Sequence, residues 1–167
     1  MSPLQNLAPA ILFKPDRKVA ASAPYPITPL ELATHFGRSA YRQQLLSGFR
    51  AWLSALQKVV SPQFVWIGGS FVTDKPEPRD IDAVVFYRYL VPDVSAADRD
   101  NLLRANTEIL SHTSVERRFN VDCALVPLDV DATQLFHASA YWAMVFSNDA
   151  KGGRRAFYTR SCAEDAA

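Results

Sequence analysis

Residues 64–87 read FVWIGGSFVTDKPEPRDIDAVVFY, and this stretch decides the fold. An apolar run that ends at Ile67 is followed by Gly68-Gly69-Ser70, a polar loop, and a second apolar run that opens with Asp80-Ile81-Asp82. Runs of about four to eight residues rich in Val, Ile and Phe, bounded by turn residues, are typical of buried strands. The stretch therefore predicts two strands of a buried sheet, joined by a loop that starts with a glycine turn.

Two acidic residues stand at the start of the second predicted strand. Because side chains alternate along a strand, Asp80 and Asp82 should project from the same face, roughly 6–7 Å apart along the backbone. Carboxylates this close repel each other unless a cation lies between them. Oxygen ligands that keep their charge suit Mg²⁺ or Mn²⁺. The pair therefore predicts a divalent-metal site.

The turn Gly68-Gly69-Ser70 provides a second binding feature. Glycine permits positive φ and a close approach of the backbone to a ligand. We expect a strand-to-helix turn, whose free N–H groups and positive dipole end suit a phosphate. Ser70 precedes Asp80 by ten residues, so the predicted phosphate-binding turn and metal pair outline a nucleotide–metal site.

These motifs resemble the signature of the nucleotidyltransferase superfamily, which has the DNA polymerase beta-like fold. The matching features are an apolar residue and Gly-Ser, nine intervening residues, and alternating acidic and apolar residues. The superfamily implies a third carboxylate on a later strand, and Asp122 stands in the apolar run Phe119–Val126. A looser similarity, from about Pro26 to Thr159, is to small bacterial nucleotidyltransferase-like proteins. The resemblance implies an α/β (α+β) domain with a minimal nucleotidyltransferase fold, in which helices flank a mixed β-sheet.

The resemblance also implies roles for individual residues. Asp80 and Asp82 would ligate two Mg²⁺ (or Mn²⁺) ions, and Asp122 would ligate the catalytic ion and help to activate the attacking hydroxyl. The turn residues Gly68, Gly69 and Ser70 would hold the terminal phosphates of a nucleoside triphosphate, expected to be ATP. Lys75 in the following loop either reaches a phosphate or is a solvated loop lysine.

Two functions remain open. Only 45 residues follow Asp122, which leaves little room for the extra helical domains of template-directed polymerases. The resemblance favours an enzyme that transfers NMP from an NTP to a protein, RNA or small-molecule acceptor, with toxin–antitoxin or phage-defence pairs as one setting. The alternative is a non-catalytic nucleotide-sensing or partner-binding module, antitoxin-like or regulatory, with the same fold.

Composition limits the class of protein. The 167 residues fit one domain, and a net charge of +1 does not indicate a DNA partner. No apolar run reaches the roughly 18–20 residues that cross a bilayer, and we identify no signal peptide. With two cysteines, Cys123 and Cys162, we expect neither a disulfide nor a zinc site. These features predict a cytoplasmic protein without a membrane partner, and they leave the oligomeric state undecided.

The remaining pattern divides the chain into an arm over 1–26, a domain over 27–160 and a loose tail over 161–167. The arm is either a flexible terminus or a segment for oligomer or partner contact. Arg117-Arg118 should lie in a solvated turn before the third strand, 119–126, with a phosphate contact as the alternative. Thr28 followed by Glu31 predicts a capping box at the start of a helix over 28–36. We expect further helices over 39–60, 96–110 and 132–146, and a last, edge strand over 154–159 whose arginines protect its open side.

Overall fold

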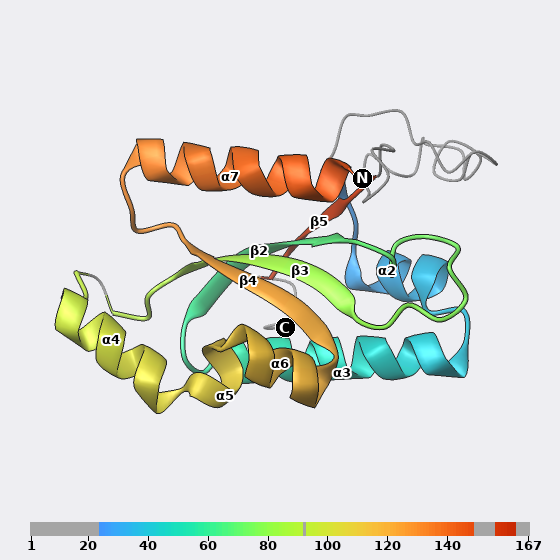
Figure 1. Cartoon of the computed structure of the whole chain (residues 1–167), viewed down its shortest axis with the longest axis horizontal. Coiled ribbons are helices and arrows are strands. Elements are labelled where there is room, and N and C mark those ends of the chain that lie inside the picture. The colour runs from blue at the N-terminus through green and yellow to red at the C-terminus, as the bar shows by residue number, and fades with distance from the viewer. Residues whose placement is uncertain (1–23, 92, 149–155, 163–167) are drawn as a thin grey trace.

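A computed structural model describes residues 24–91, 93–148 and 156–162, and all structural statements concern these residues. A five-stranded sheet with strand order β1-β5-β2-β3-β4 forms its centre (Figure 1). Strands β2 and β3 pair antiparallel, as do β2 and β5, whereas β3–β4 and β1–β5 are parallel. The mixed sheet with its helices confirms the predicted α/β class. The strands are β1 (Tyr25–Pro26), β2 (Ser61–Gly68), β3 (Ile81–Arg88), β4 (Val121–Pro127) and β5 (Tyr158–Ser161).

Helices cover both faces of the sheet. Figure 1 shows α7 on one side, and α3, α5 and α6 on the other. None of the helices within the described residues is both long and apolar enough to cross a membrane. The helices are α2 (Pro29–Phe36), α3 (Ala40–Leu56), α4 (Ala96–Ala105), α5 (Thr107–Leu110), α6 (His112–Phe119) and α7 (Ala132–Ser147).

Strand alternation divides the core into two clusters. Odd-numbered side chains of β2 and β3, such as Val65 and Val85, pack with Phe49 and Trp52 of α3. Even-numbered side chains pack on the other face with α7, in a cluster that contains Trp66, Val84, Phe86 and Phe146. Each strand is therefore apolar on both faces, as the uninterrupted apolar runs predicted.

Local signals set where the first helices begin. The predicted capping box at Thr28 is present, since Glu31 N–H donates to Thr28 Oγ1 (3.2 Å) and Thr28 N–H to Glu31 Oε2 (2.8 Å). Ser95 likewise caps α4 by accepting from Asp98 N–H. The longest helix, α3, ends at Leu56, four residues before the predicted Val60. There the chain turns into β2.

The prediction was wrong for the segment before β4. The expected helix over 96–110 is interrupted at Asn106, and the expected turn around Arg117-Arg118 is a helix, α6. This helix has only 8 residues, and Val115 is its one buried residue, so its two apolar residues, Val115 and Phe119, are too few to reveal a helix in the sequence. Asn120 ends α6 with a left-handed φ of 54°.

The C-terminal prediction was also wrong. Strand β5 lies between β1 and β2 and is not an edge strand, because Tyr25–Pro26 of the expected arm pairs outside it. Cys162, placed in a loose tail, is buried, and its N–H donates to Gln63 O at 3.0 Å. Long-range pairing of this kind leaves no local sequence signal. The rest of the arm and tail, and residues 154–155, lie outside the described residues.

We predict that Gly48→Ala destabilises the protein. In an exposed helix this change normally stabilises by about 1 kcal/mol. Here a Cβ on Gly48 would overlap the backbone carbonyl of Phe119, where α3 contacts α6. A backbone carbonyl cannot rotate away from the new methyl group as a side chain could. We therefore expect a loss of about 1–3 kcal/mol in the free energy of unfolding, measured by urea denaturation. The exposed neighbour Ser47→Ala is the control, and equal stability of the two variants would contradict this packing.

We also predict a loss of stability at alkaline pH. Burial raises the pKa of Cys123 from 9.0 to about 12 and that of Tyr158 from 10.0 to about 12. The unfolded chain therefore releases these protons at lower pH than the folded protein. The stability that the protonated Cys123 and Tyr158 side chains contribute is complete below pH 9, and it is lost as the pH rises to about 12. Urea denaturation at several pH values should show this decline, and a smaller one in Cys123→Ala; a flat profile from pH 9 to 12 would refute it.

Candidate functional site

A row of three residues crosses the sheet at the predicted motifs. Gly68 of β2 pairs with Asp82 of β3, and Asp82 pairs with Asp122 of β4. Residues in register on neighbouring strands point to the same face. The sheet therefore brings Asp122, forty residues further along the chain, beside Asp82 on the face that α7 covers.

Both glycines of the turn make room for side chains. Gly69 has φ +68°, and a Cβ there would overlap the Asp82 carboxylate, which lies directly over its backbone. A Cβ on Gly68 would stand 2.7 Å from the Phe146 ring of α7. The structure thus shows Gly69 in contact with one of the predicted acids, whereas Gly68 packs against α7.

The turn is not followed by a helix, contrary to the expectation. Residues 69–80 form turns and bends that lead back into β3. Within them Ser70 O accepts from the Thr73 hydroxyl at 2.7 Å and from its N–H at 3.3 Å. Any anion bound here would meet backbone N–H groups of a turn, without the dipole of a following helix.

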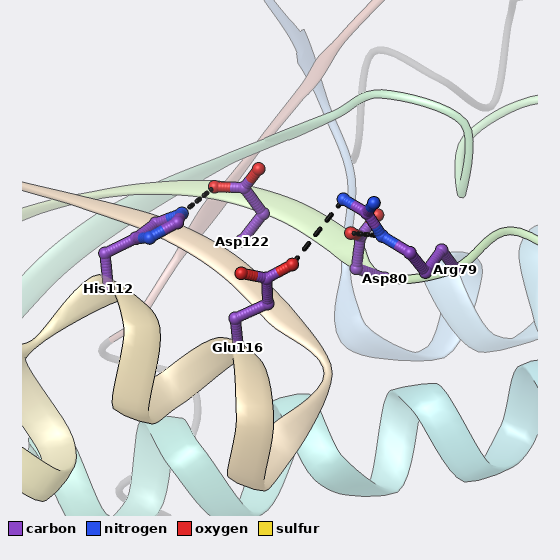
Figure 2. A network of polar contacts seen from close by, with 5 residues as sticks. All are labelled: Arg79, Asp80, His112, Glu116 and Asp122. Carbon is purple, nitrogen blue, oxygen red and sulfur yellow. Dashed lines mark hydrogen bonds and ion pairs between the residues drawn. The ribbon is translucent and has the colours of Figure 1, made fainter.

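Asp80 belongs to an ion-pair network. It lies just before β3, it is only 6% exposed, and its Oδ2 accepts from Arg79 Nε at 2.8 Å. An Nη of Arg79 also lies 3.5 Å from Glu116 of α6 (Figure 2). The hydrogen bond and charge of Asp80, followed by the charge of Glu116, raise the pKa of Arg79. The guanidinium thus neutralises the buried carboxylate.

Asp122 has a different partner. Its Oδ1 lies 2.8 Å from His112 Nε2, at the start of α6 (Figure 2). An ionised carboxylate only accepts, so His112 donates in this pair. His112 and Glu116 were missed as site residues because α6 was missed. Their spacing of four would have placed them on one helix face.

The chemistry of the acids fits a hard divalent cation, but their side chains do not converge. Among the described residues, no three of His, Cys, Asp or Glu are gathered as a metal site. Asp80 contacts Arg79, Asp122 contacts His112, and the Asp82 carboxylate lies over Gly69. For the three acids to bind one cation, their side chains would have to rotate. The backbone already brings the three residues close together at the strand ends.

Lys75 lies apart from the acids. It lines a hollow of about 260 Å³ with residues of α2, α3 and its own loop, and none of the three acids lines it. Asp80 instead lines a separate hollow of about 270 Å³. A larger cavity, about 470 Å³, lies beside the other end of β3, near Tyr89 and Leu102. None of the three predicted site acids lines it. The structure therefore does not bring Lys75 to the predicted site.

A buried arginine that the sequence analysis did not single out holds the loop after Ser70. Arg42 is 6% exposed, and its guanidinium lies 4.8 Å from the centre of the Phe71 ring. Burial, and then the charge of Arg38, lowers its pKa. The available signal was a charge on the apolar stripe of α3. The Arg42 guanidinium donates to the backbone oxygens of Phe36, Phe71, Thr73 and Lys75.

The fold and site define a mixed α/β protein with two aspartates in register on adjacent parallel strands. The chain belongs to DUF6932, a family of unknown function whose model matches residues 5–158. This range includes the glycine turn, the three acids and the Arg42 contacts. No curated protein and no solved structure matches the chain.

The contact between Gly69 and Asp82 generates a prediction. Gly69→Ala should lower the free energy of unfolding by about 1–3 kcal/mol, because the residue has positive φ and its Cβ would displace the carboxylate. Asp82→Ala removes the obstacle, so the double variant should recover at least about 0.5 kcal/mol relative to additivity. A double-mutant cycle by urea denaturation measures this coupling. Strict additivity would show that the two residues are not in contact.

Proposed function

We propose that this protein is a divalent-metal-dependent nucleotidyltransferase that transfers NMP from an NTP to an acceptor hydroxyl. The observation that carries the proposal is the row Gly68–Asp82–Asp122, with Gly69 directly beneath the Asp82 carboxylate. Two acids on adjacent strands beside a glycine turn match the arrangement that the sequence resemblance implies. Asp80, two residues before Asp82, completes the carboxylate set.

In this proposal Asp80, Asp82 and Asp122 would hold Mg²⁺ or Mn²⁺. Bound metal would supply charge neutralisation at the phosphates and polarisation of the attacking hydroxyl. His112 donates to Asp122 Oδ1, which fixes the rotamer of that carboxylate. The second oxygen of Asp122 would ligate the metal that polarises the acceptor hydroxyl. The hydroxyl oxygen would then bond to the α-phosphorus of the NTP as pyrophosphate leaves, and the hydroxyl proton would pass to solvent. The backbone N–H groups of Gly69 and Ser70 would bind the terminal phosphates.

The acceptor class rests on the resemblance. A protein, an RNA or a small molecule in a toxin–antitoxin or phage-defence setting is consistent with a chain of this size. ATP is the nucleotide we expect. The hollow beside Asp80, lined in part by Arg79, Thr113 and Arg117, is open to an acceptor that carries hydrogen-bonding groups.

The second candidate function is a nucleotide-sensing or partner-binding module without turnover. It is favoured by a specific observation: Arg79 and His112 already engage two of the three acids. A guanidinium on Asp80 neutralises the charge that a cation would otherwise neutralise. In this version the same strands bind a nucleotide or partner but do not activate a hydroxyl.

Label transfer tests the proposal. Purified protein is incubated with each α-³²P-labelled NTP, Mg²⁺ or Mn²⁺, and lysate of the source cells. We expect a labelled protein, RNA or small molecule that requires the metal. Asp82→Asn and Asp122→Asn should each reduce labelling at least about 100-fold, because each removes a ligand charge that acts in the transition state. The exposed Asp100→Asn on α4 is the matched control and should label normally.

The outcomes separate the two functions. Labelling lost with the acids but retained in Asp100→Asn supports the transferase. No labelling, together with metal-dependent NTP binding that the same acids abolish, supports the sensing module. No labelling and no NTP binding would reject the nucleotide site itself.

A further inference from the structure

The hollow that contains Lys75 has a composition of its own. It lies between the end of α2, the start of α3 and the loop before β3, and its volume is about 260 Å³. This space accommodates a group of several non-hydrogen atoms. Its wall consists of His35, Arg38, Ser39, Arg42, Thr73, Asp74, Lys75 and Pro76.

The wall carries an excess of positive charge. Three cations, Arg38, Arg42 and Lys75, face one carboxylate, Asp74, so the formal charge is +2 with His35 neutral. Arg38 stands close enough to Arg42 for its charge to lower the Arg42 pKa. Like charges held this close favour a bound anion, which lowers their mutual repulsion.

The buried arginine at the base of the hollow is held in place before any ligand arrives. Arg42 is 6% exposed and donates to carbonyls at the end of α2 and along the loop, including Lys75 O at 2.6 Å. Its guanidinium also lies against the Phe71 ring. Because these contacts fix Arg42 and the backbone of Lys75, an anion would not have to order them, and binding would lose less entropy.

We propose that this hollow is an anion site that binds a phosphate or pyrophosphate group, separate from the acids on β3 and β4. Lys75 and Arg38 provide charged donors at its rim, and Arg42 provides the fixed charge at its base. Arginine and lysine bind phosphate oxygens by charge-assisted hydrogen bonds. The Ser39 hydroxyl, which accepts from Arg42 N–H at the start of α3, adds a neutral donor. The site does not depend on nucleotidyl transfer.

Calorimetric titration with pyrophosphate, in EDTA and near 0.1 M ionic strength, tests the site. The wild-type chain should bind pyrophosphate, and Lys75→Gln and Arg38→Gln should each weaken binding about tenfold or more. Lys58→Gln is the matched control, since it removes the same charge from an exposed lysine that lies outside this hollow. Asp74→Asn should tighten binding, because it removes the carboxylate from the wall. Circular dichroism checks that each variant is folded.

Further measurements show where pyrophosphate binds and whether the natural ligand is a nucleotide phosphate or a free anion. Asp80→Asn/Asp82→Asn should leave pyrophosphate binding within about twofold of wild type, because neither acid lines the hollow. Displacement of pyrophosphate by metal-free ATP would support the site with nucleotide phosphates as the source. If metal-free ATP does not displace pyrophosphate, the result would support the site as one that takes a free inorganic anion. Absence of binding to the wild-type chain, or equal weakening by Lys58→Gln and Lys75→Gln, would overturn the proposal.

Discussion

The hydrogen-bonded register of β3 between β2 and β4 is the constraint on which the candidate site depends. It places Asp82 opposite Gly68 on one side and beside Asp122 on the other. A shift of one residue in either ladder would turn one acid into the apolar core. The core residues on both faces of β3, such as Val84 and Val85, resist that shift because each packs against its own layer of helices. Burial on two faces therefore holds two carboxylates in a fixed relation.

Two arginines, Arg42 and Arg79, stabilise the segment between β2 and β3. Arg42 joins the end of α2 to the loop after Ser70, and Arg79 neutralises Asp80 where β3 begins. The two guanidiniums act at different depths. Arg42 is buried and bonds to carbonyls, so it maintains a backbone shape, whereas Arg79 is exposed and bonds to a carboxylate. Since the Asp80 carboxylate is buried, Arg79 matters mainly because it neutralises that charge at the strand end.

The loop between β2 and β3 connects the two regions of binding chemistry. Its first residue, Gly69, contacts Asp82, and Lys75 lines the basic hollow. The sequence placed Gly69 and Ser70 in a phosphate site through the family resemblance, and it left Lys75 either at a phosphate or solvated in the loop. The structure separates them, since Arg42 holds the backbone of the loop against α3 and Lys75 lines the hollow at that side.

The sequence by itself determined the elements with strong local signals: the capped start of α2, the apolar runs of β2, β3 and β4, and the acids at their ends. It also indicated that Asp122 belongs with Asp82, through a family resemblance. Tertiary structure alone decided the position of β5 inside the sheet, the helical state of α6, and the partners that His112, Glu116 and Arg42 find. The physical reason is range. Caps and apolar runs act over a few residues, whereas strand order and polar pairing depend on residues that only the folded chain brings together.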